Sequence, residues 1–270
     1  MKRRILITLL LAACGDDGNS IADAGMTGEL TLANCTTTIA DDVPEPYRSL
    51  FHCVDMKLEG TDLAITTSGL PPHPSAYYAT SSPNYIAWDD RGGAYHQNPN
   101  KLAKKTTTIV VPLTPVASGV TITAAKIDGI VGTSSNEYKM GAAGVALDSV
   151  MLFNPLAAPG DDIADEQFTF DPYNAHPAPG GEYHYHRDSI GPVATGIEAY
   201  GIMCDGTFVL GCTELGGAAV NESDLDDQNG HSHMIESLDV RYHVHLCPTS
   251  ADHPRPYTPE IAFYNRCTVR

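Results

Sequence analysis

Gly181-Glu182-Tyr183-His184-Tyr185-His186 is a stretch in which tyrosine and histidine alternate. Aromatic residues of this kind suit a pleated, half-buried β-strand. Because side chains alternate between the two faces of a strand, both tyrosines point one way and both histidines point the other. The two histidine Cα atoms then lie roughly 6.6 Å apart on one face, so both rings can bind one metal ion.

The same alternation recurs downstream in Arg241-Tyr242-His243-Val244-His245-Leu246, where His243 and His245 share a face. Each copy follows a similar segment. Residues 170–176 and 225–231 both read as an apolar residue, Asp, two residues, Asn, one residue and His. A weaker similarity relates Leu147-Asp148-Ser149-Val150 to Ile197-Glu198-Ala199-Tyr200, because each places an acid inside an apolar run. We interpret these matches as a diverged internal duplication, with halves at about 140–190 and 191–270.

The remaining pattern predicts a mainly β, single compact domain with short helices only. Short runs rich in β-branched and aromatic residues, separated by Gly, Pro, Asn and Ser, predict strands at 63–67, 85–88, 106–111, 120–123 and 126–131. The longer apolar run 144–153 predicts a central strand. Segments 194–203 and 207–210 predict a hairpin turning at Asp205-Gly206. Short helical turns are expected within 47–51 and 157–167.

The N-terminus is typical of an exported lipoprotein. Residues 1–13 combine three basic residues with a short apolar core, as a signal peptide does, and Leu11-Ala12-Ala13-Cys14 resembles a bacterial lipobox. We therefore expect lipid, such as palmitate, on Cys14, a flexible tether over 14–29, and anchoring in the cell envelope. Gly15 favours the outer membrane. The alternative is an ordinary signal peptide with an incidental cysteine. An N-terminal disulfide-containing extension (30–58) and the β domain (60–270) follow.

The net charge of the chain excludes some classes of binding partner. Without the three basic residues of the signal peptide, the chain keeps 13 Lys+Arg against 33 Asp+Glu, a formal charge of −20. This acidity argues against nucleic acid and against anionic lipid surfaces, so we expect membrane contact only through the N-terminal lipid. It is compatible with attraction of metal cations, although solubility alone also explains it.

Six cysteines remain after Cys14, and an even number in an exported protein indicates disulfides. Proximity in the sequence favours the pairs Cys35–Cys53, Cys204–Cys212 and Cys247–Cys267, which is one of 15 connectivities. Paired cysteines do not supply thiolate ligands.

A third histidine is available to each His-x-His strand, namely His176 for the first and His231 for the second. Three imidazoles with a water or a carboxylate suit Zn²⁺, Cu²⁺ or Fe²⁺, and the first-row affinity order favours copper. We expect copper or zinc. The six histidines form either two mononuclear sites or one site where the halves meet.

Further residues are candidates for the same chemistry. Asp171 and Asp226 stand five residues before His176 and His231, either as ligands or as acceptors that fix a histidine tautomer. Asp148 and Glu198 sit in apolar runs, where a buried carboxylate needs a partner. His73, in a Pro-rich turn, is either a further ligand or a loop histidine. The histidines at positions 96, 233 and 253 are expected to be exposed.

Several motifs together resemble those of the YHYH domain family of exported bacterial proteins. They occur in order at residues 69–73, 144–148, 174–176, 181–186, 226–231 and 242–245. The resemblance covers roughly residues 60–270. The chain departs from the family at Val244, where Tyr is common, at Ala175, where Gly is usual, and at residues 197–200. The resemblance implies metal binding and carries no settled activity.

Three functions fit these observations. The first is a cell-envelope lipoprotein that binds a transition metal, with copper favoured, for sequestration or delivery. The second is a metal-dependent hydrolase or oxidoreductase, with Asp171 or Asp148 as base to a metal-bound water. The third is a structural or interaction module in which the tyrosine and histidine ladders only pack. A closed ligand shell favours binding, and an open metal position in a cleft favours catalysis.

Overall fold

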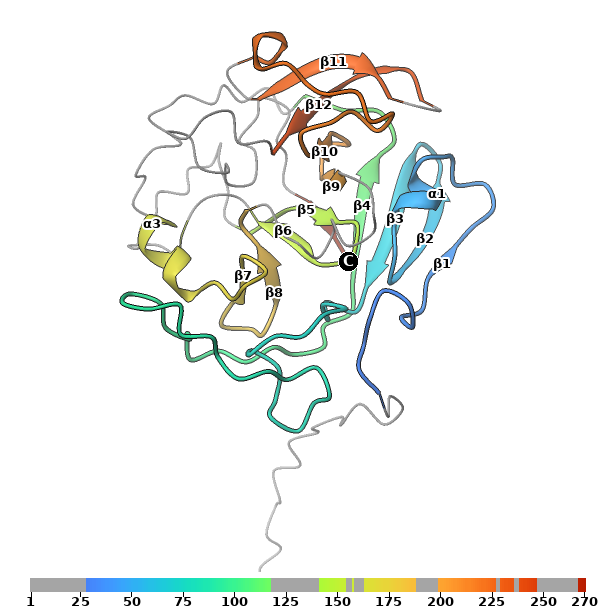
Figure 1. The fold of residues 1–270 in the computed structure, drawn as a ribbon. Helices are drawn as coiled ribbons and strands as arrows, with labels where there is room; N and C mark the ends of the chain where they lie inside the picture. The colour runs from blue at the N-terminus through green and yellow to red at the C-terminus, as the bar shows by residue number, and fades with distance from the viewer. Residues whose placement is uncertain are drawn as a thin grey trace, which may run out of the picture.

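The computed structural model describes residues 28–117, 141–153, 157, 163–187, 199–226, 229–235, 238–246 and 267–270. Their thirteen strands form two sheets, so the mainly β prediction is confirmed (Figure 1). The helices described are single turns, α1 (Tyr47–Leu50) and α3 (Ile163–Glu166), with two 3-10 turns at Gln167–Thr169 and Glu222–Asp224. Among these residues, no helix is long and apolar enough to cross a membrane.

Several predictions concern residues outside this described part. They are the signal peptide, Cys14, the tether up to residue 27, the strands at 120–123 and 126–131, Glu198, Cys247 and His253.

The first sheet has the strand order β1-β2-β3-β4-β13. Its strands are β1 (Thr38–Ile39), β2 (Val54–Glu59), β3 (Asp62–Thr67), β4 (Thr107–Pro112) and β13 (Thr268–Val269). β2 and β3 form an antiparallel hairpin that pairs Glu59 with Asp62. The boundary expected between residues 58 and 60 therefore falls inside one hairpin, and the N-terminal extension shares a sheet with the chain that follows.

The second sheet holds the histidine strands at its two ends, in the order β11-β12-β10-β9-β5-β6-β8-β7 (Figure 1). One arm comprises β5 (Ala142–Ala146), β6 (Met151–Phe153), β8 (Tyr183–Tyr185) and β7 (Ala175–Pro177). The other comprises β9 (Ala199–Met203), β10 (Phe208–Leu210), β12 (Val240–His245) and β11 (Gly230–Met234). In each arm an antiparallel hairpin is followed by a parallel pairing to the histidine strand.

The expectation of one central strand over residues 144–153 is wrong, because the chain turns within it. Ala146 donates its N–H to Val150 O, and Ser149 occupies the turn with φ +78°. The predicted hairpin at Asp205-Gly206 is confirmed, with Met203 N–H bonded to Thr207 O. Asp148 therefore corresponds in position to Asp205, and not to Glu198. The two arms match in strand order and turn geometry, while a duplicated origin stays a prediction.

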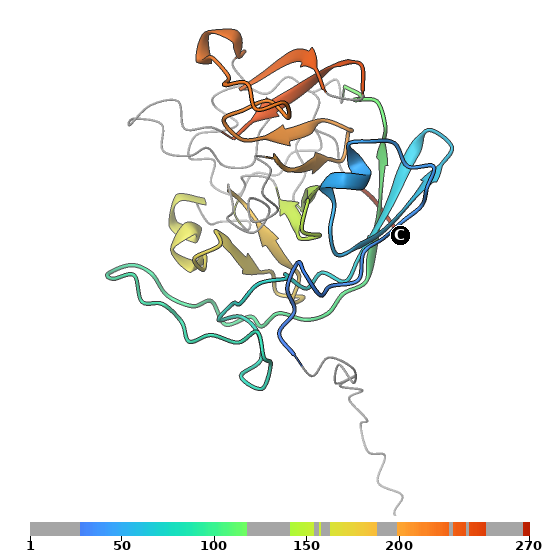
Figure 2. The same cartoon turned by 45° about the vertical axis from the view of Figure 1, so that its right-hand side comes forward.

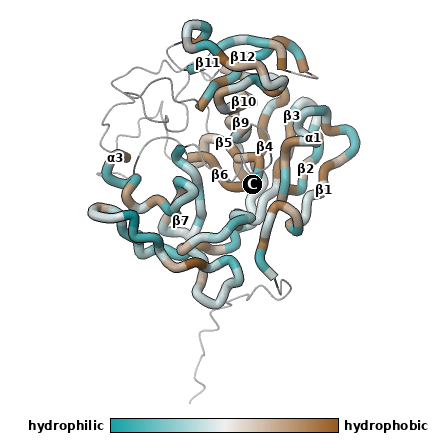
Figure 3. Tube along the Cα trace, in the orientation of Figure 1, coloured by the Kyte–Doolittle hydropathy of each residue, from teal (hydrophilic) through white to brown (hydrophobic). Residues whose placement is uncertain are grey.

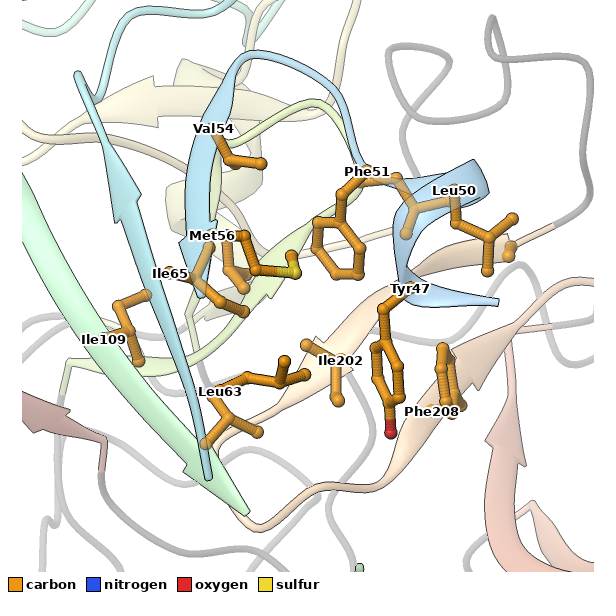
Figure 4. Packing of buried hydrophobic residues seen from close by; sticks show 14 of the residues in the cluster. Tyr47, Leu50, Phe51, Val54, Met56, Leu63, Ile65, Ile109, Ile202 and Phe208 are labelled. Carbon is orange, nitrogen blue, oxygen red and sulfur yellow. The ribbon is translucent and has the colours of Figure 1, made fainter. Parts of the chain in front are cut away.

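The core lies between the two sheets (Figures 2 and 4). The predicted helix at residues 47–51 forms as α1, and its Tyr47 stacks on Phe208 of the second sheet at 5.1 Å. Ile65 and Ile109 of the first sheet belong to the same buried cluster as Ile202 of β9. Hydrophobic residues mark the central strands of both sheets in Figure 3. This shared core fixes the middle of the eight-stranded sheet and leaves its ends to carry the histidines.

The disulfides agree only in part with the expected pairing. Cys35 bonds Cys53, as proximity in the sequence predicts, with Cα atoms 5.2 Å apart. Cys204 bonds Cys267 and not Cys212, with Cα atoms 4.8 Å apart. Cys212 also forms a disulfide. Folding places the end of β9 beside the start of β13, and spatial reach decides pairing whatever the loop length.

The two central strands approach so closely that they require glycine. A Cβ on Gly201 of β9 would lie 2.2 Å from the carbonyl oxygen of Val145, and one on Gly144 of β5 would lie 2.4 Å from that of Ile202. Both obstacles are backbone atoms, which cannot rotate away. We expect Gly201→Ala to lower the free energy of unfolding by about 1–3 kcal/mol.

Denaturant unfolding followed by circular dichroism measures this effect. Gly216→Ala is the matched control, because a Cβ there meets nothing within 4 Å. Equal midpoints for the two variants would contradict the close approach of β5 and β9.

Candidate metal centres

Both histidine pairs project from the same face of the eight-stranded sheet. His184 is paired with Met151 of β6, and His243 is paired with Phe208 of β10. Registered partners on neighbouring strands point to the same side. Met151 and Phe208 both belong to the core that faces the first sheet. The histidines therefore flank that core at its two ends, and the tyrosines of β8 point to the opposite face.

The first cluster, called here the buried site, consists of His176, His184 and His186. His176 of β7 is the registered partner of His184 across the strand pair, which brings the predicted third histidine to the first two. The Nε2 atoms of His184 and His186 are 2.9 Å apart. Donor atoms around one tetrahedral Zn²⁺ ion are separated by about 3.3 Å, so the cluster has nearly the spacing of a metal site.

The walls of the buried site are aromatic and closed. The ring of Phe153 stacks on His184 at 3.8 Å, and Phe170 stacks on His186 at 5.3 Å. The three histidines are only 2–3 % exposed. Burial lowers the pKa of His176 to about 2 and that of His184 well below its usual value, so these rings are neutral. Neutral imidazole is the form that binds a metal ion.

The second cluster, called here the acidic site, consists of Glu214, His231, His243 and His245. His231 of β11 is the registered partner of His243 of β12, the same relation that joins His176 to His184. The Nε2 atom of His231 lies 3.0 Å from that of His243 and 3.3 Å from that of His245. All four ligand atoms lie within 4.8 Å of one another.

Backbone carbonyls fix the orientation of the ligand rings. Nδ1 of His184 contacts the carbonyl of Glu182 at 2.9 Å. Nδ1 of His243 contacts that of Arg241 at 3.0 Å, and Nδ1 of His245 contacts that of Gly211 at 2.7 Å. A carbonyl oxygen only accepts, so Nδ1 must carry the proton in each neutral ring. Each Nε2 lone pair therefore faces its cluster, in the arrangement that metal ligands adopt.

His176 reaches the same tautomer through a hydroxyl. The shortest contact of its Nδ1 is to Oγ1 of Thr169, at 2.6 Å. That hydroxyl donates its own proton to the carbonyl of Glu166, at 2.8 Å, and then accepts from His176, while the amide nitrogen of Asn98 lies farther from the same Nδ1, at 3.3 Å. The Nε2 of His176 is left facing the buried site.

The two clusters are separate sites. From β8 to β12 the sheet order crosses β6, β5, β9 and β10, which makes five strand intervals. At about 4.8 Å an interval the histidine strands are roughly 24 Å apart. Of the two arrangements left open by the sequence, the structure has two separate histidine clusters and not one shared cluster.

Asp171 and Asp226 lie near the histidine strands but do not contact the clustered nitrogens. Oδ2 of Asp171 accepts hydrogen bonds from Tyr183 and Ser75, both at 2.6 Å. Oδ2 of Asp226 accepts one from Tyr242 at 2.9 Å. Tyrosines occupy the opposite face from histidines, so both carboxylates bond tyrosines there and neither belongs to a histidine cluster of the described residues. They anchor the tyrosine side of each histidine strand.

Asp148 and His73 belong to this tyrosine face as well. The hydroxyl of Tyr185 donates to Oδ2 of Asp148 at 2.7 Å and contacts Nε2 of His73 at 3.0 Å. His73 also stacks on Tyr173 at 3.6 Å. Burial raises the pKa of Asp148 to about 6 and lowers the pKa of His73 to about 4. His73 is therefore a packed histidine beside Tyr185, and not a ligand of either cluster.

Sequence reasoning missed the acids that approach the clusters. Glu214 places Oε1 2.8 Å from Nε2 of His231 and Oε2 3.1 Å from Nε2 of His243. Glu166 places Oε1 3.6 Å from Nε2 of His176. Both precede the third histidine of their arm, but by 17 and 10 residues, so no shared spacing marks them. Glu166 ends the short helix α3 and Glu214 lies between β10 and β11, and the strand pattern does not specify the position of either segment.

The two arms differ at the residue that faces the hairpin aspartate. Asp148 receives the Tyr185 hydroxyl, whereas the position equivalent to Tyr185 in the second arm is Val244, which pairs with Val209 as Tyr185 pairs with Leu152. Asp205 is 1 % exposed, and within the described residues no hydrogen bond reaches its Oδ2 atom. Burial raises the pKa of Asp205 to about 7.

Comparison with known proteins finds a family model that matches part of the chain. Residues 97–207 match the family model described as YHYH protein. The match includes the hairpin strands β5 and β6 and the whole buried site, and it ends before β11 and β12. It is narrower than the range of 60–270 expected from the motifs. No curated protein and no solved structure matches the chain.

The raised pKa of Asp205 predicts a pH-dependent stability. The folded state holds this proton up to about pH 7, while the unfolded state releases it near pH 3.8. Folding therefore binds a proton between these values, and stability falls as pH rises from 4 to 8, by up to about 4 kcal/mol from this group. We expect Asp205→Asn to remove that part of the pH dependence.

Urea unfolding at pH 4, 6 and 8 measures the difference between the wild type and the variant. The other buried carboxylates titrate in both proteins and cancel. A constant difference across the three pH values would contradict a raised pKa at Asp205.

Proposed function

We propose that this protein, whose residues 97–207 match the YHYH family model, binds one transition metal ion at the buried site and one at the acidic site. The ligands are His176, His184 and His186 in the first, and His231, His243, His245 and Glu214 in the second. The domain would hold metal for sequestration or delivery in the cell envelope.

One observation carries this proposal. Glu214 is 9 % exposed, and no hydrogen bond from the described residues reaches its Oε2 atom. The same atom lies 3.1 Å from Nε2 of His243, whose proton is on the other ring nitrogen. A buried carboxylate oxygen facing imidazole lone pairs is unfavourable without a cation. A metal ion at their centre would satisfy all of these groups.

Copper is the favoured metal. Imidazole suits Cu²⁺, Zn²⁺ and Fe²⁺, and affinity for a given nitrogen and oxygen site is highest for Cu²⁺ in the divalent first-row series. Zinc is the alternative, because three histidines with a carboxylate give the four-coordinate set that Zn²⁺ commonly adopts. When bound, either ion would supply positive charge where the lone pairs converge.

Closure of the buried site favours metal binding over catalysis. A catalytic ion needs a coordination position that substrate can reach. His176, His184 and His186 are 2–3 % exposed, and Phe153 and Phe170 stack on their rings. Asp148 and Asp171, considered as bases for a hydrolase or oxidoreductase, bond tyrosines on the other face. An enzyme would therefore have to use the acidic site.

Metal content tests the proposal. We expect the purified protein, without affinity-tag histidines, to bind about two Cu²⁺ or Zn²⁺ ions per chain in mass spectrometry under native conditions. His184→Gln with His186→Gln would remove one ion, and His243→Gln with His245→Gln would remove the other, because roughly 24 Å separates the strands.

His96→Gln with His52→Gln is the matched control, since neither residue belongs to a cluster. Circular dichroism verifies that each variant is folded. Unchanged metal content in both double variants, or no metal uptake by the folded wild type, would overturn the proposal and favour a packing role for the histidines.

The cellular location is proposed from the sequence alone. Leu11-Ala12-Ala13-Cys14 supports lipid attachment at Cys14, with Gly15 favouring the outer membrane. We expect radiolabelled palmitate to enter the wild type in cells and Cys14→Ser to abolish labelling and release the protein from the membrane fraction. Labelling that persists in Cys14→Ser would contradict this assignment.

A further inference from the structure

His233 lies at the outer end of the acidic site, where a metal ion would arrive. Its side chain is 55 % exposed, and it stands two residues after His231 on β11. The two rings stack nearly parallel, with centroids 5.9 Å apart and an interplanar angle of 14°. β11 is the edge strand of its sheet. His233 therefore extends the ligand row of the acidic site into solvent.

Glu214 connects His233 to the buried ligands. Its Oε2 atom lies 3.9 Å from Nδ1 of His233 and 3.1 Å from Nε2 of His243. Its Oε1 atom lies 2.8 Å from Nε2 of His231. The Oε2 atom thus lies between the exposed His233 and the buried His243, while the Oε1 atom contacts His231.

The spacing between His233 and Glu214 suits a transient ion. Two donors on one tetrahedral ion with bonds near 2.0–2.1 Å lie about 3.3 Å apart, so the exposed ring needs to move by only about half an ångström. Nδ1 of His233 also lies 3.1 Å from the carbonyl of Met234, to which it donates when it carries the proton. In the other tautomer, its lone pair is available to the ion.

Among the described residues, the buried site has no exposed histidine equivalent to His233. The position two residues after His176 is Ala178, which has no donor atom in its side chain. His176, His184 and His186 are 2–3 % exposed, whereas His231 is 17 % exposed in its side chain. In the acidic site His243 and His245 are equally buried, at 0–1 % exposed, so the two sites share a ligand geometry and differ in solvent access at the third histidine.

We propose that His233 and Glu214 form an entry site that captures a divalent metal ion and passes it to His231, His243 and His245. The acidic site then exchanges metal with the surroundings, while the buried site retains it. This inference rests on the proposed function and adds to it a kinetic role for a residue outside the four-residue cluster.

Metal uptake kinetics test the entry site. Metal-free full-length protein is mixed with excess Co²⁺ in a stopped-flow instrument, and its visible absorption reports occupancy. The wild type should show a fast phase, lost in His243→Gln with His245→Gln, and a slow phase, lost in His184→Gln with His186→Gln. His233→Ala should slow the fast phase about tenfold, an effect of the size seen for groups adjacent to metal ligands. It should leave the final stoichiometry unchanged.

Two further variants make the result specific. His233→Asp keeps a metal-binding side chain at the same place and should restore much of the fast rate. His96→Ala removes an exposed histidine of another loop and should have no effect. A fast phase unchanged in His233→Ala, or a fast phase that belongs to the buried site, would overturn the entry role. Failure of the wild type to bind Co²⁺, Cu²⁺ or Zn²⁺ at all would instead refute the proposed function.

Discussion

The period of two along β8 and β12 is the constraint on which both sites depend. It sends His184 and His186 to the face that meets the first sheet, and it sends Tyr183 and Tyr185 to the opposite face. The two faces therefore have different roles. The tyrosine hydroxyls satisfy buried carboxylates, and the histidines present Nε2 lone pairs that carbonyls or a hydroxyl hold in place. A slip of one residue in strand pairing would exchange the two faces and deprive Asp148 and Asp171 of their tyrosine donors.

The central pair of strands sets the distance between the sites. Gly144 and Gly201 allow β5 and β9 to approach so closely that a Cβ on either would meet the opposite backbone. The same core of Tyr47, Ile65 and Phe208 covers the middle of the sheet (Figure 4). Histidine strands at the two ends therefore cannot converge on one ion. The protein therefore has two separate histidine clusters, and each is formed by its own pair of neighbouring strands.

The histidine triads could be predicted from the sequence because they follow from local rules. Alternation places His184 beside His186, and an antiparallel neighbour supplies His176, just as β11 supplies His231. The carboxylates could not be assigned in this way. Asp171 and Asp226 have a repeated spacing that suggests ligands, yet strand alternation brings them to tyrosines. Glu214 has no repeated spacing and still reaches the cluster, because a loop between β10 and β11 determines its position.

Two predictions from the sequence were wrong, one about a turn and one about a disulfide. The apolar run at residues 144–153 indicated one strand, but Asp148 and Ser149 turn the chain there as Asp205 and Gly206 do in the second arm. Aligning Asp148 with Glu198 obscured this correspondence. Likewise, sequence proximity paired Cys204 with Cys212, while the fold brings it to Cys267 across 63 residues. Both errors have one cause: neighbours in the sheet, and not neighbours in the chain, decide which groups meet.

Under the proposed function, the differences between the arms would let one ligand geometry serve two purposes. Tyr185 donates to Asp148, but Val244 offers no hydroxyl, and Oδ2 of Asp205 receives no hydrogen bond from the described residues. The first arm thus has Asp148 and Asp171 paired with tyrosine hydroxyls, and its histidines are nearly inaccessible. In the second arm the edge strand carries His233, which is 55 % exposed and lies beside the buried Glu214. The affinity of a metal site depends on its donor atoms, whereas its exchange rate depends on the path by which an ion reaches them. The enclosed ligands of the first arm would therefore retain an ion, and the more accessible ligands of the second arm would exchange one.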